Sequence, residues 1–384
     1  MTINLKNFLK DKPKMSKMGE FQQLQEVAGL EISAISADLY GSGRDDLCLF
    51  YFKDGANYGA AYTNNSICSE SITWNRNIRK KFIKALLVNT KNANTFTGQQ
   101  GQEGLDSISK SLAKNLTLKE SQKKDGTRNV IKPNEVLFAS TGVIGEKFPA
   151  QQIKGSVPNL IDKLRDKQNK FVWFKAASSI MTTDTRPKLA YEECRLWNKD
   201  IRLCGIAKGS GMIAPNMATT LAFVFTDADI PSIYLKSLLK RTIPNSFNAI
   251  TVDSDTSTND MVAIFSTNKI KTGKIYNILD PKLKDFENAL QRLLTHLAKQ
   301  IVSDGEGAKK FVTVKVVNAR SQQMAKSIAF SIANSPLFKT AIAGEDPNWG
   351  RVIMGIGKSG EKISPQKIEI KFGGLKVAEK GKIS

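Results

Sequence analysis

The sequence predicts an α/β fold. Short apolar runs typical of buried strands alternate along the chain with longer segments of helical periodicity. With 384 residues, of which 41% are hydrophobic and 24% charged, the chain can bury a large core and form two lobes. The clearest helix covers residues 283–302, where apolar side chains recur on one face and Gly305 follows as a plausible helix stop.

The first half of the chain contains most of the expected strands. Apolar runs separated by Gly-containing turns predict strands at 32–37, 47–52, 85–89 and 135–139. Helices are expected at about 102–115 and at about 149–168, the second interrupted by Pro158.

The second half is expected to carry more helix. An apolar strand at 221–225 precedes a short amphipathic helix at 231–241, and beyond the long helix we expect a strand at 311–317 and a helix at 319–334. Gly355–Gly360 satisfies the pattern GxGxxG, but no helical pattern follows and Pro365 intrudes, so a dinucleotide site is not expected.

Composition excludes several classes of function. The four cysteines show no CxxC spacing and His296 is the single histidine, so neither a metal site nor a Ser-His-Asp mechanism is expected. No apolar run is long enough to span a membrane and no secretory signal is present, so a cytoplasmic protein with reduced thiols is expected. The net charge of +21 comes from lysines spread over the whole chain, which favours a solvated surface over nucleic-acid binding.

One loop, Lys208 to Thr220, is rich in Gly and Pro and leads directly into the strand at 221–225. A Thr inside a chain is a poor nucleophile, but a Thr at a chain terminus carries its own base, because its α-amine lies within reach of its Oγ. Cleavage between Ala218 and Thr219 would therefore turn this loop into an active site. The alternative is a β-turn that feeds a core strand, with two Thr chosen for β propensity.

Other polar groups follow apolar runs. The run 140–145, which contains Gly142, follows the strand at 135–139; its backbone N–H groups can converge on an oxyanion, but on sequence alone a plain turn is the favoured alternative. The run 180–185 holds three hydroxyls and a carboxylate, which suggests a polar loop at a strand end or a capped turn. Glu306 stands between two glycines, where it could hold a substrate ammonium or simply be solvated. The acidic run 252–260 lacks the Gly and Glu of a calcium loop.

The loop sequence from Lys208 to Thr219, KGSGMIAPNMAT, resembles the self-cleavage segment of the ornithine acetyltransferase (glutamate N-acetyltransferase) family of arginine biosynthesis. A second specific match is GEDPNWGR at Gly344–Arg351. Moderate matches, all in family order, occur at residues 60–65, which resemble the family's N-terminal strand, and at 92–101, 140–146, 180–185, 252–260 and 304–308.

The resemblance implies a layered sheet-and-helix fold of the ornithine acetyltransferase or DmpA-like type, made of two chains cut from one precursor. Residues 1–218 would form the α chain and residues 219–384 the β chain, assembled as a heterotetramer of two copies of each. The implied reaction is ping-pong transfer of acetyl from N-acetylornithine to glutamate through acetyl-Thr219. No cofactor is implied, and acetyl-CoA remains open as a further donor.

The resemblance also implies the residue roles. Thr219 is the nucleophile and contacts substrate, and Ala218 precedes the cut. Thr141 and Gly142 form the oxyanion hole, and Thr182, Lys208 and Glu306 contact the amino-acid substrates. Family members usually extend further than Ser384, so an inactive shortened homologue stays open. A terminal-Thr amidase or aminopeptidase would use the same nucleophile, and a basic nucleic-acid-binding protein would fit the net charge.

Overall fold

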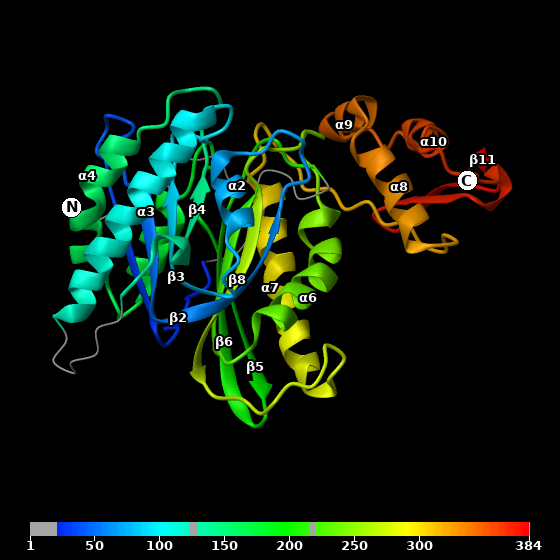
Figure 1. The fold of residues 1–384 in the computed structure, drawn as a ribbon. Helices are drawn as coiled ribbons and strands as arrows, with labels where there is room; N and C mark the ends of the chain where they lie inside the picture. Colours follow the sequence, from blue (N-terminus) through cyan, green and yellow to red (C-terminus); the bar gives the residue numbers. More distant parts are fainter. Residues whose placement is uncertain (1–20, 123–129, 215–219, 384) are drawn as a thin grey trace. The chain divides into compact units, whose positions relative to one another are not determined.

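The computed structural model describes residues 21–122, 130–214 and 220–383. The described chain divides into a larger compact unit, residues 21–250 and 255–306, and a smaller one, residues 251–254 and 307–383. The predicted α/β class is confirmed, because both units combine strands with helices (Figure 1). In the described ranges, no helix combines the length and the apolar character that crossing a bilayer requires.

One large sheet organises the larger unit. Its strands run in the order β4-β3-β2-β8-β7-β6-β5, and β1 pairs with β2. The pairs β3–β4 and β7–β8 are parallel, and the other neighbours are antiparallel. The strands are β1 (Leu30–Ile35), β2 (Leu47–Tyr62), β3 (Phe82–Asn89), β4 (Val136–Ser140), β5 (Lys188–Leu196), β6 (Lys199–Lys208), β7 (Leu221–Ala228) and β8 (Met261–Ile270).

Strand β2 bends back on itself, and this bend creates the core. The ring of Phe50 stacks on that of Phe225, with 4.7 Å between ring centroids, and Phe225 pairs with Phe265. Phe265 in turn pairs with Tyr58, eight residues after Phe50, a separation of about 26 Å in a straight strand. The two halves of β2 must therefore face each other across the buried aromatic rings, and Figure 1 shows the bend in blue.

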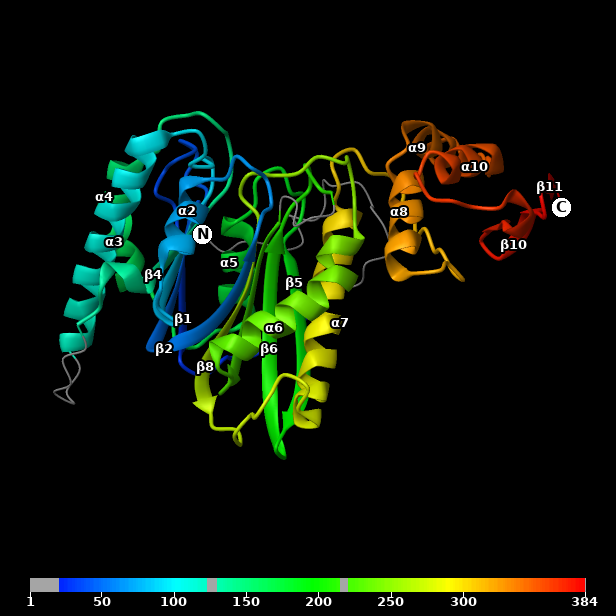
Figure 2. The same cartoon turned by 45° about the vertical axis from the view of Figure 1, so that its right-hand side comes forward.

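Helices cover both outer faces of the folded sheet. Helices α3 (Gly98–Ser121) and α4 (Ala150–Asp162) pack on the face of the first half that is opposite to Phe50. Helix α7 (Lys284–Ser303) packs so closely on β6 that a Cβ at Gly205 would lie 2.6 Å from Leu293. Helix α6 (Ser232–Thr242) approaches β2 in the same way at Gly59. The larger unit is thus a sequence of layers, helix–sheet–sheet–helix (Figure 2), as the predicted layered fold requires.

The smaller unit has its own small core. Helices α8 (Gln322–Ala333), α9 (Pro336–Ala343) and α10 (Trp349–Gly357) pack with β9 (Glu369–Phe372), β10 (Leu375–Glu379) and β11 (Lys382–Ile383). The glycines of the GxGxxG pattern fall in and just after α10, so they form no phosphate-binding turn between a strand and a helix. Short 3-10 helices are Pro133–Glu135, Ile243–Asn245, Phe247–Ala249, Pro281–Leu283 and Pro365–Lys367.

Several expectations for individual elements were wrong. Residues 311–317 form no strand: Val314 and Val316 pack on the smaller core, but the segment has no partner strand in the described chain. The polar run 180–185 follows a helix, α5 (Lys170–Ser179), and not a strand. This helix is capped by Asn169, and most of its residues are buried or half-buried. Helix α4 continues through Pro158 and ends at Asp162. Helix α2 (Glu70–Asn77), the β5–β6 hairpin and β8 were not expected from the sequence.

Candidate active site

The predicted oxyanion segment lies where β4 ends. Ser140 is fixed by a hydrogen bond to the Asn89 side chain (2.7 Å), and the Thr141 N–H donates to the Asn89 carbonyl. Gly142 has φ +136°, and a Cβ there would lie 2.2 Å from the Lys91 carbonyl, so only glycine fits. Among the described residues, no hydrogen-bond acceptor is found for the Gly142 N–H, which leaves this donor for a ligand.

Lys208, the last residue of β6, lies next to Thr141. Its Nζ donates to the Thr141 hydroxyl at 2.9 Å, and the side chain is buried. Burial lowers the pKa of Lys208, against the raising effect of Asp184 and other carboxylates. Because the Thr141 oxygen accepts this bond, its own O–H proton points elsewhere and can serve a developing oxyanion.

A buried ion cluster supports the Lys208 loop from behind. Lys188 donates to Asp184 and to Asp304, both at 2.6 Å, and the three side chains are almost completely buried. Asp184 also accepts the Gly209 N–H (2.7 Å) and the Thr182 N–H (3.0 Å). Although burial alone raises it, Lys188 and Lys208 hold the pKa of Asp184 well below its usual range. The cluster therefore fixes Thr182 next to the loop that carries Lys208.

Glu306 lies at the rim of the same region. Its N–H donates to the Ser210 carbonyl (2.9 Å), and the Ser210 hydroxyl donates to the Asp304 carbonyl (2.6 Å). A Cβ at Gly211 would lie 2.7 Å from the Glu306 carboxylate, so glycine is needed for this approach. Glu306 is exposed and interacts electrostatically with Lys208, which suits a carboxylate that binds a substrate ammonium.

Ala218 and Thr219 lie outside the described residues, and their roles stay predictions. The chain is described again from Thr220, whose N–H donates to Asp260 at 2.6 Å. The next residue, Leu221, pairs with Lys208 across β7 and β6. The five described residues predicted for the site thus gather around Lys208 and the residues that directly follow it. These described residues supply oxyanion donors, a buried amine and an accessible carboxylate, which is a set suited to acyl transfer.

Four polar residues that build this region received no individual role from the sequence: Lys188, Asp260, Asp304 and Asn259. Asn259 donates to the carbonyls of Ala93 (2.6 Å) and Ser140 (2.8 Å), so it joins the loop after β3 to the end of β4. Asp260 and Asn259 belong to the acidic run 252–260, which resembles the family's sequence and was expected near the site, but its single residues were assigned no role. In the described part of the chain, no group of His, Cys, Asp and Glu is placed to hold a metal ion.

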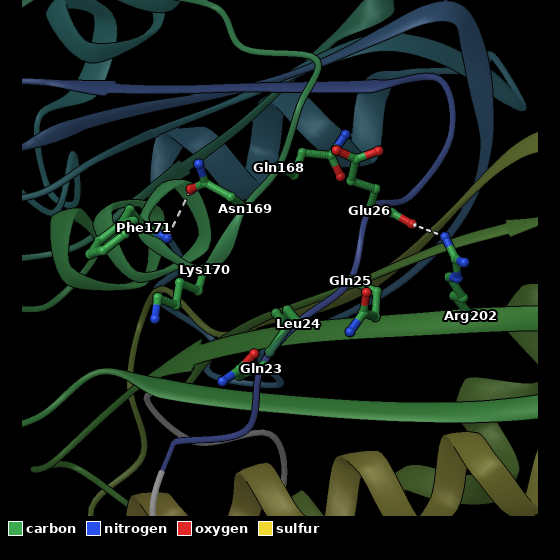
Figure 3. A pocket seen from close by; sticks show the side chains of 9 residues that line it. All are labelled: Gln23, Leu24, Gln25, Glu26, Gln168, Asn169, Lys170, Phe171 and Arg202. Carbon is green, nitrogen blue, oxygen red and sulfur yellow. Dashed lines mark hydrogen bonds between the residues drawn. The ribbon is translucent and has the colours of Figure 1, made fainter.

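A separate depression of about 580 Å³ involves none of the predicted site residues. Several of its polar groups already have structural roles: Asn169 caps α5 by accepting the Phe171 N–H, and Arg202 donates to the Glu26 carbonyl (Figure 3). Gln168 is bonded to Val27 and Leu30. We therefore assign no chemistry to this depression. It is lined by Gln23, Leu24, Gln25, Glu26, Gln168, Asn169, Lys170, Phe171 and Arg202.

Comparison with known proteins gives a match over most of the chain. The family model "ArgJ family" matches residues 31–384. The "Arginine biosynthesis bifunctional protein ArgJ" of Gluconobacter oxydans (strain 621H) is 43% identical over 359 residues, which cover 93% of this chain and 81% of the relative. The protein of the same description from Rhizobium meliloti (strain 1021) is 40% identical over 365 residues, which cover 94% of this chain and 84% of the relative.

Two solved structures of similar proteins cover about half of this chain. The arginine biosynthesis bifunctional protein from Bacillus halodurans is 26% identical with a TM-score of 0.44, and the match covers 52% of this chain and 98% of that one. The ornithine acetyltransferase from Mycobacterium tuberculosis, complexed with ornithine, is 25% identical with a TM-score of 0.42. The match covers 51% of this chain and 98% of that one.

Proposed function

Because the chain belongs to the ArgJ family of acetyltransferases of arginine biosynthesis, we propose that it transfers acetyl from N-acetylornithine to glutamate through an acetyl ester at Thr219. The observation that supports these residue roles most directly is the Lys208–Thr141 hydrogen bond. It joins two residues that lie far apart in the sequence and that the sequence motifs place independently in the site.

The proposed reaction begins with chain cleavage. The Thr219 hydroxyl attacks the Ala218 carbonyl, the peptide C–N bond breaks, and water hydrolyses the resulting ester. This leaves a carboxylate on Ala218 and a free α-amine on Thr219. The products are an α chain, residues 1–218, and a β chain, residues 219–384.

Acetyl transfer then takes place in two half-reactions. The Thr219 α-amine takes the proton of its own Oγ, which attacks the acetyl carbonyl of N-acetylornithine. The amide bond breaks, and ornithine leaves with that proton. The α-amine of glutamate attacks the acetyl ester, N-acetylglutamate leaves, and the proton returns to Oγ. Thr141 and Gly142 donate to the oxyanion in both half-reactions, and each such donor contributes about 3–4 kcal/mol.

Substrate contacts are assigned by the same reasoning. Glu306 is the accessible carboxylate at the rim and would hold a substrate ammonium. Thr182, which is half-buried beside Asp184, and Lys208 would orient the polar groups of the amino acid. We further propose that two α and two β chains assemble, that acetyl-CoA can serve as a second acetyl donor, and that the protein acts in the cytoplasm.

A denaturing gel with N-terminal sequencing tests the first step. From the mass of 42.3 kDa, cleavage gives fragments of roughly 24 and 18 kDa, the smaller starting Thr-Thr-Leu-Ala. A single uncut band from the wild-type chain would contradict the proposal, and Thr219→Ala serves as the uncut control.

Isotope exchange tests the second step. N-acetylornithine carrying a labelled acetyl group is incubated with the enzyme and glutamate, and the expected product is labelled N-acetylglutamate. Release of labelled acetate without transfer to glutamate would instead identify an amidase that uses the same terminal threonine.

A further inference from the structure

The side-chain amide of Asn259 makes all the hydrogen bonds that an asparagine side chain can make, and the residue is 8% exposed. Its Nδ2 donates to the carbonyls of Ala93 (2.6 Å) and Ser140 (2.8 Å). Its Oδ1 accepts the hydroxyls of Thr95 (2.8 Å) and Thr258 (2.6 Å). Because carbonyls only accept hydrogen bonds, the NH₂ group must face Ala93 and Ser140, and the reversed orientation of the amide is excluded.

The bond to the Ser140 carbonyl acts on the start of the oxyanion segment. This carbonyl lies in the same planar peptide unit as the Thr141 N–H, because the peptide bond does not rotate. The Thr141 N–H donates to the Asn89 carbonyl at 3.0 Å. Asn259 and Asn89 therefore hold this peptide plane at both of its polar ends.

The Gly142 N–H belongs to the next peptide unit along the chain. On its far side, the Val143 N–H donates to the Lys91 carbonyl at 2.9 Å. The Gly142 N–H itself has no acceptor among the described residues. Rotation about the backbone torsions of Thr141 and Gly142 would turn this free N–H, so it keeps one direction only while the planes before and after it stay fixed.

We propose that Asn259 is a positioning residue that aims the Gly142 N–H at the oxyanion formed during acetyl transfer. The inference rests on the proposed function, and it adds a residue that acts through the Ser140 carbonyl without touching the substrate. A donor stabilises an oxyanion strongly only when it is already oriented before the reaction. The bond from Asn259 supplies part of that orientation from a segment 119 residues away in the sequence.

The same hydrogen bonds have a consequence for the two-chain form of the enzyme. The proposed cut after Ala218 places Asn259 in the β chain, whereas Ala93, Thr95 and Ser140 belong to the α chain. Three of the four hydrogen bonds of the Asn259 side chain then join the two chains. The oxyanion donor of the α chain is thus oriented by a residue of the β chain.

Asn259→Leu tests the inference, because leucine has nearly the shape of asparagine and removes both donors without adding a charge that would itself repel an oxyanion. In the cleaved enzyme we expect kcat for acetyl transfer to fall about 10- to 100-fold, which is less than the loss expected when a whole oxyanion donor is removed. KM should stay close to the wild-type value, because the oxyanion exists only in the transition state.

Asn75→Leu is the matched control. Asn75 is also buried and also bonds to the backbone of β4, but two residues before Ser140: its Nδ2 donates to the Phe138 carbonyl (2.7 Å), and its Oδ1 accepts the Phe138 N–H (2.9 Å). This variant should lose stability, as Asn259→Leu does, but keep most of the wild-type kcat. Equal losses of kcat in the two variants would assign Asn259 to general support of the fold and overturn the inference.

An NMR measurement on the uncut Thr219→Ala chain reads the Gly142 N–H without any catalysis. When glycine is labelled at its nitrogen and threonine at its carbonyl carbon, a carbonyl-coupled amide signal arises only from glycines that follow threonine. These glycines are Gly98, Gly142 and Gly273. Thr141→Val removes the Gly142 signal and thereby identifies it.

The Gly142 signal should shift in Asn259→Leu and stay in place in Asn75→Leu. The Gly273 signal should stay in both variants, because Gly273 packs against Trp197 and not against the oxyanion segment. An unchanged Gly142 signal in Asn259→Leu would overturn the inference while leaving the proposed acetyl transfer intact.

Asn259→Ser replaces Asn259→Leu in both measurements if the leucine variant does not fold, because the shorter serine side chain cannot reach both carbonyls. Failure of both variants to fold would show that Asn259 serves the fold as a whole and would overturn its assignment as a positioning residue. A wild-type enzyme that forms no labelled N-acetylglutamate would instead overturn the proposed function, and this inference with it.

Discussion

One buried cluster of charge contacts Gly209 and another contacts Thr220, and the two differ in how completely their groups are paired. In the Lys188 cluster, the ammonium donates to Asp184, to Asp304 and to the Arg186 carbonyl. Both carboxylates also accept backbone N–H groups. Around Asp260, by contrast, one oxygen is without a partner among the described residues, and Lys208 donates to a neutral hydroxyl.

This difference suggests that one cluster supports the loop and the other contains groups that take part in the reaction. The fold satisfies buried charges fully where they only hold a loop in place, as at Lys188. Groups that must bind or pass a proton cannot be fully satisfied by the fold, because the ligand or the reacting group has to supply the missing partner. We therefore expect variants of the Lys188 cluster to change stability and variants around Lys208 to change activity.

The largest effect is expected for Lys188→Met. It would leave the carboxylates of Asp184 and Asp304 buried without their cation, which costs about 3–5 kcal/mol of the unfolding free energy. Urea unfolding of the uncut Thr219→Ala chain measures this. Lys175→Met is the matched control, because Lys175 pairs with Asp45 at 3.4 Å while 42% exposed, so a change of at most about 1 kcal/mol is expected. Equal losses in both variants would remove the distinction between the clusters.

The second effect concerns rate and not stability. Thr141→Val removes a hydroxyl that is proposed to donate to the oxyanion, so kcat should fall about 100- to 1000-fold. Thr141→Ser keeps the hydroxyl and should retain most activity. Lys208 acts partly through this hydroxyl, so the loss from Lys208→Met should be much smaller in a Thr141→Val background than alone. Fully additive losses would show that the 2.9 Å contact has no part in catalysis.

The sequence predicted the layers of this fold better than their connections. The strands near 47–52, 85–89 and 221–225 are buried on both faces and read as continuous apolar runs, so they were found. Strand β8 was missed because polar residues flank its apolar part. The failed strand at 311–317 has the alternation of a strand, but alternation cannot reveal whether a partner strand exists.

For the candidate site, the sequence indicated local motifs but not the residues that support them. Thr141, Gly142, Lys208 and Glu306 stand next to glycines or strand ends, which mark exposed backbone in a sequence. Lys188 and Asp304 lie 116 residues apart, and nothing local in the sequence indicates that they pair. The bend of β2 is equally invisible from sequence, although it determines that β4 and β6 meet at the site.

The third prediction uses pH, because the two clusters should give stability slopes of opposite sign. Asp184 has a lowered pKa, so the fold favours its charged form, and stability is lost as the pH falls below about 4. Asp260 has a raised pKa, so the fold favours its neutral form, and stability is lost as the pH rises from about 4 toward neutrality. A pKa that differs by 1 between the folded and the unfolded chain corresponds to about 1.4 kcal/mol of unfolding free energy.

Urea unfolding of the uncut Thr219→Ala chain between about pH 3 and pH 8 measures both slopes. Asp184→Asn should flatten the acid side of the profile, and Asp260→Asn should flatten the side toward neutral pH. Asp200→Asn is the control, because Asp200 is 78% exposed and pairs with an exposed arginine. Loss of the same slope in both test variants would mean that the two carboxyl groups are not in opposite environments.

The smallest effect is expected for His296→Gln, at the only imidazole in the chain. His296 lies in α7, eight residues before Asp304, or about 12 Å along the helix. Burial lowers its pKa, so the ring is neutral at working pH. The variant should change the unfolding free energy by no more than about 0.5 kcal/mol. It should also leave the acid limb of the pH–rate profile for acetyl transfer in place, because that limb is assigned to the Thr219 amine. Disappearance of the limb would identify the imidazole as the base.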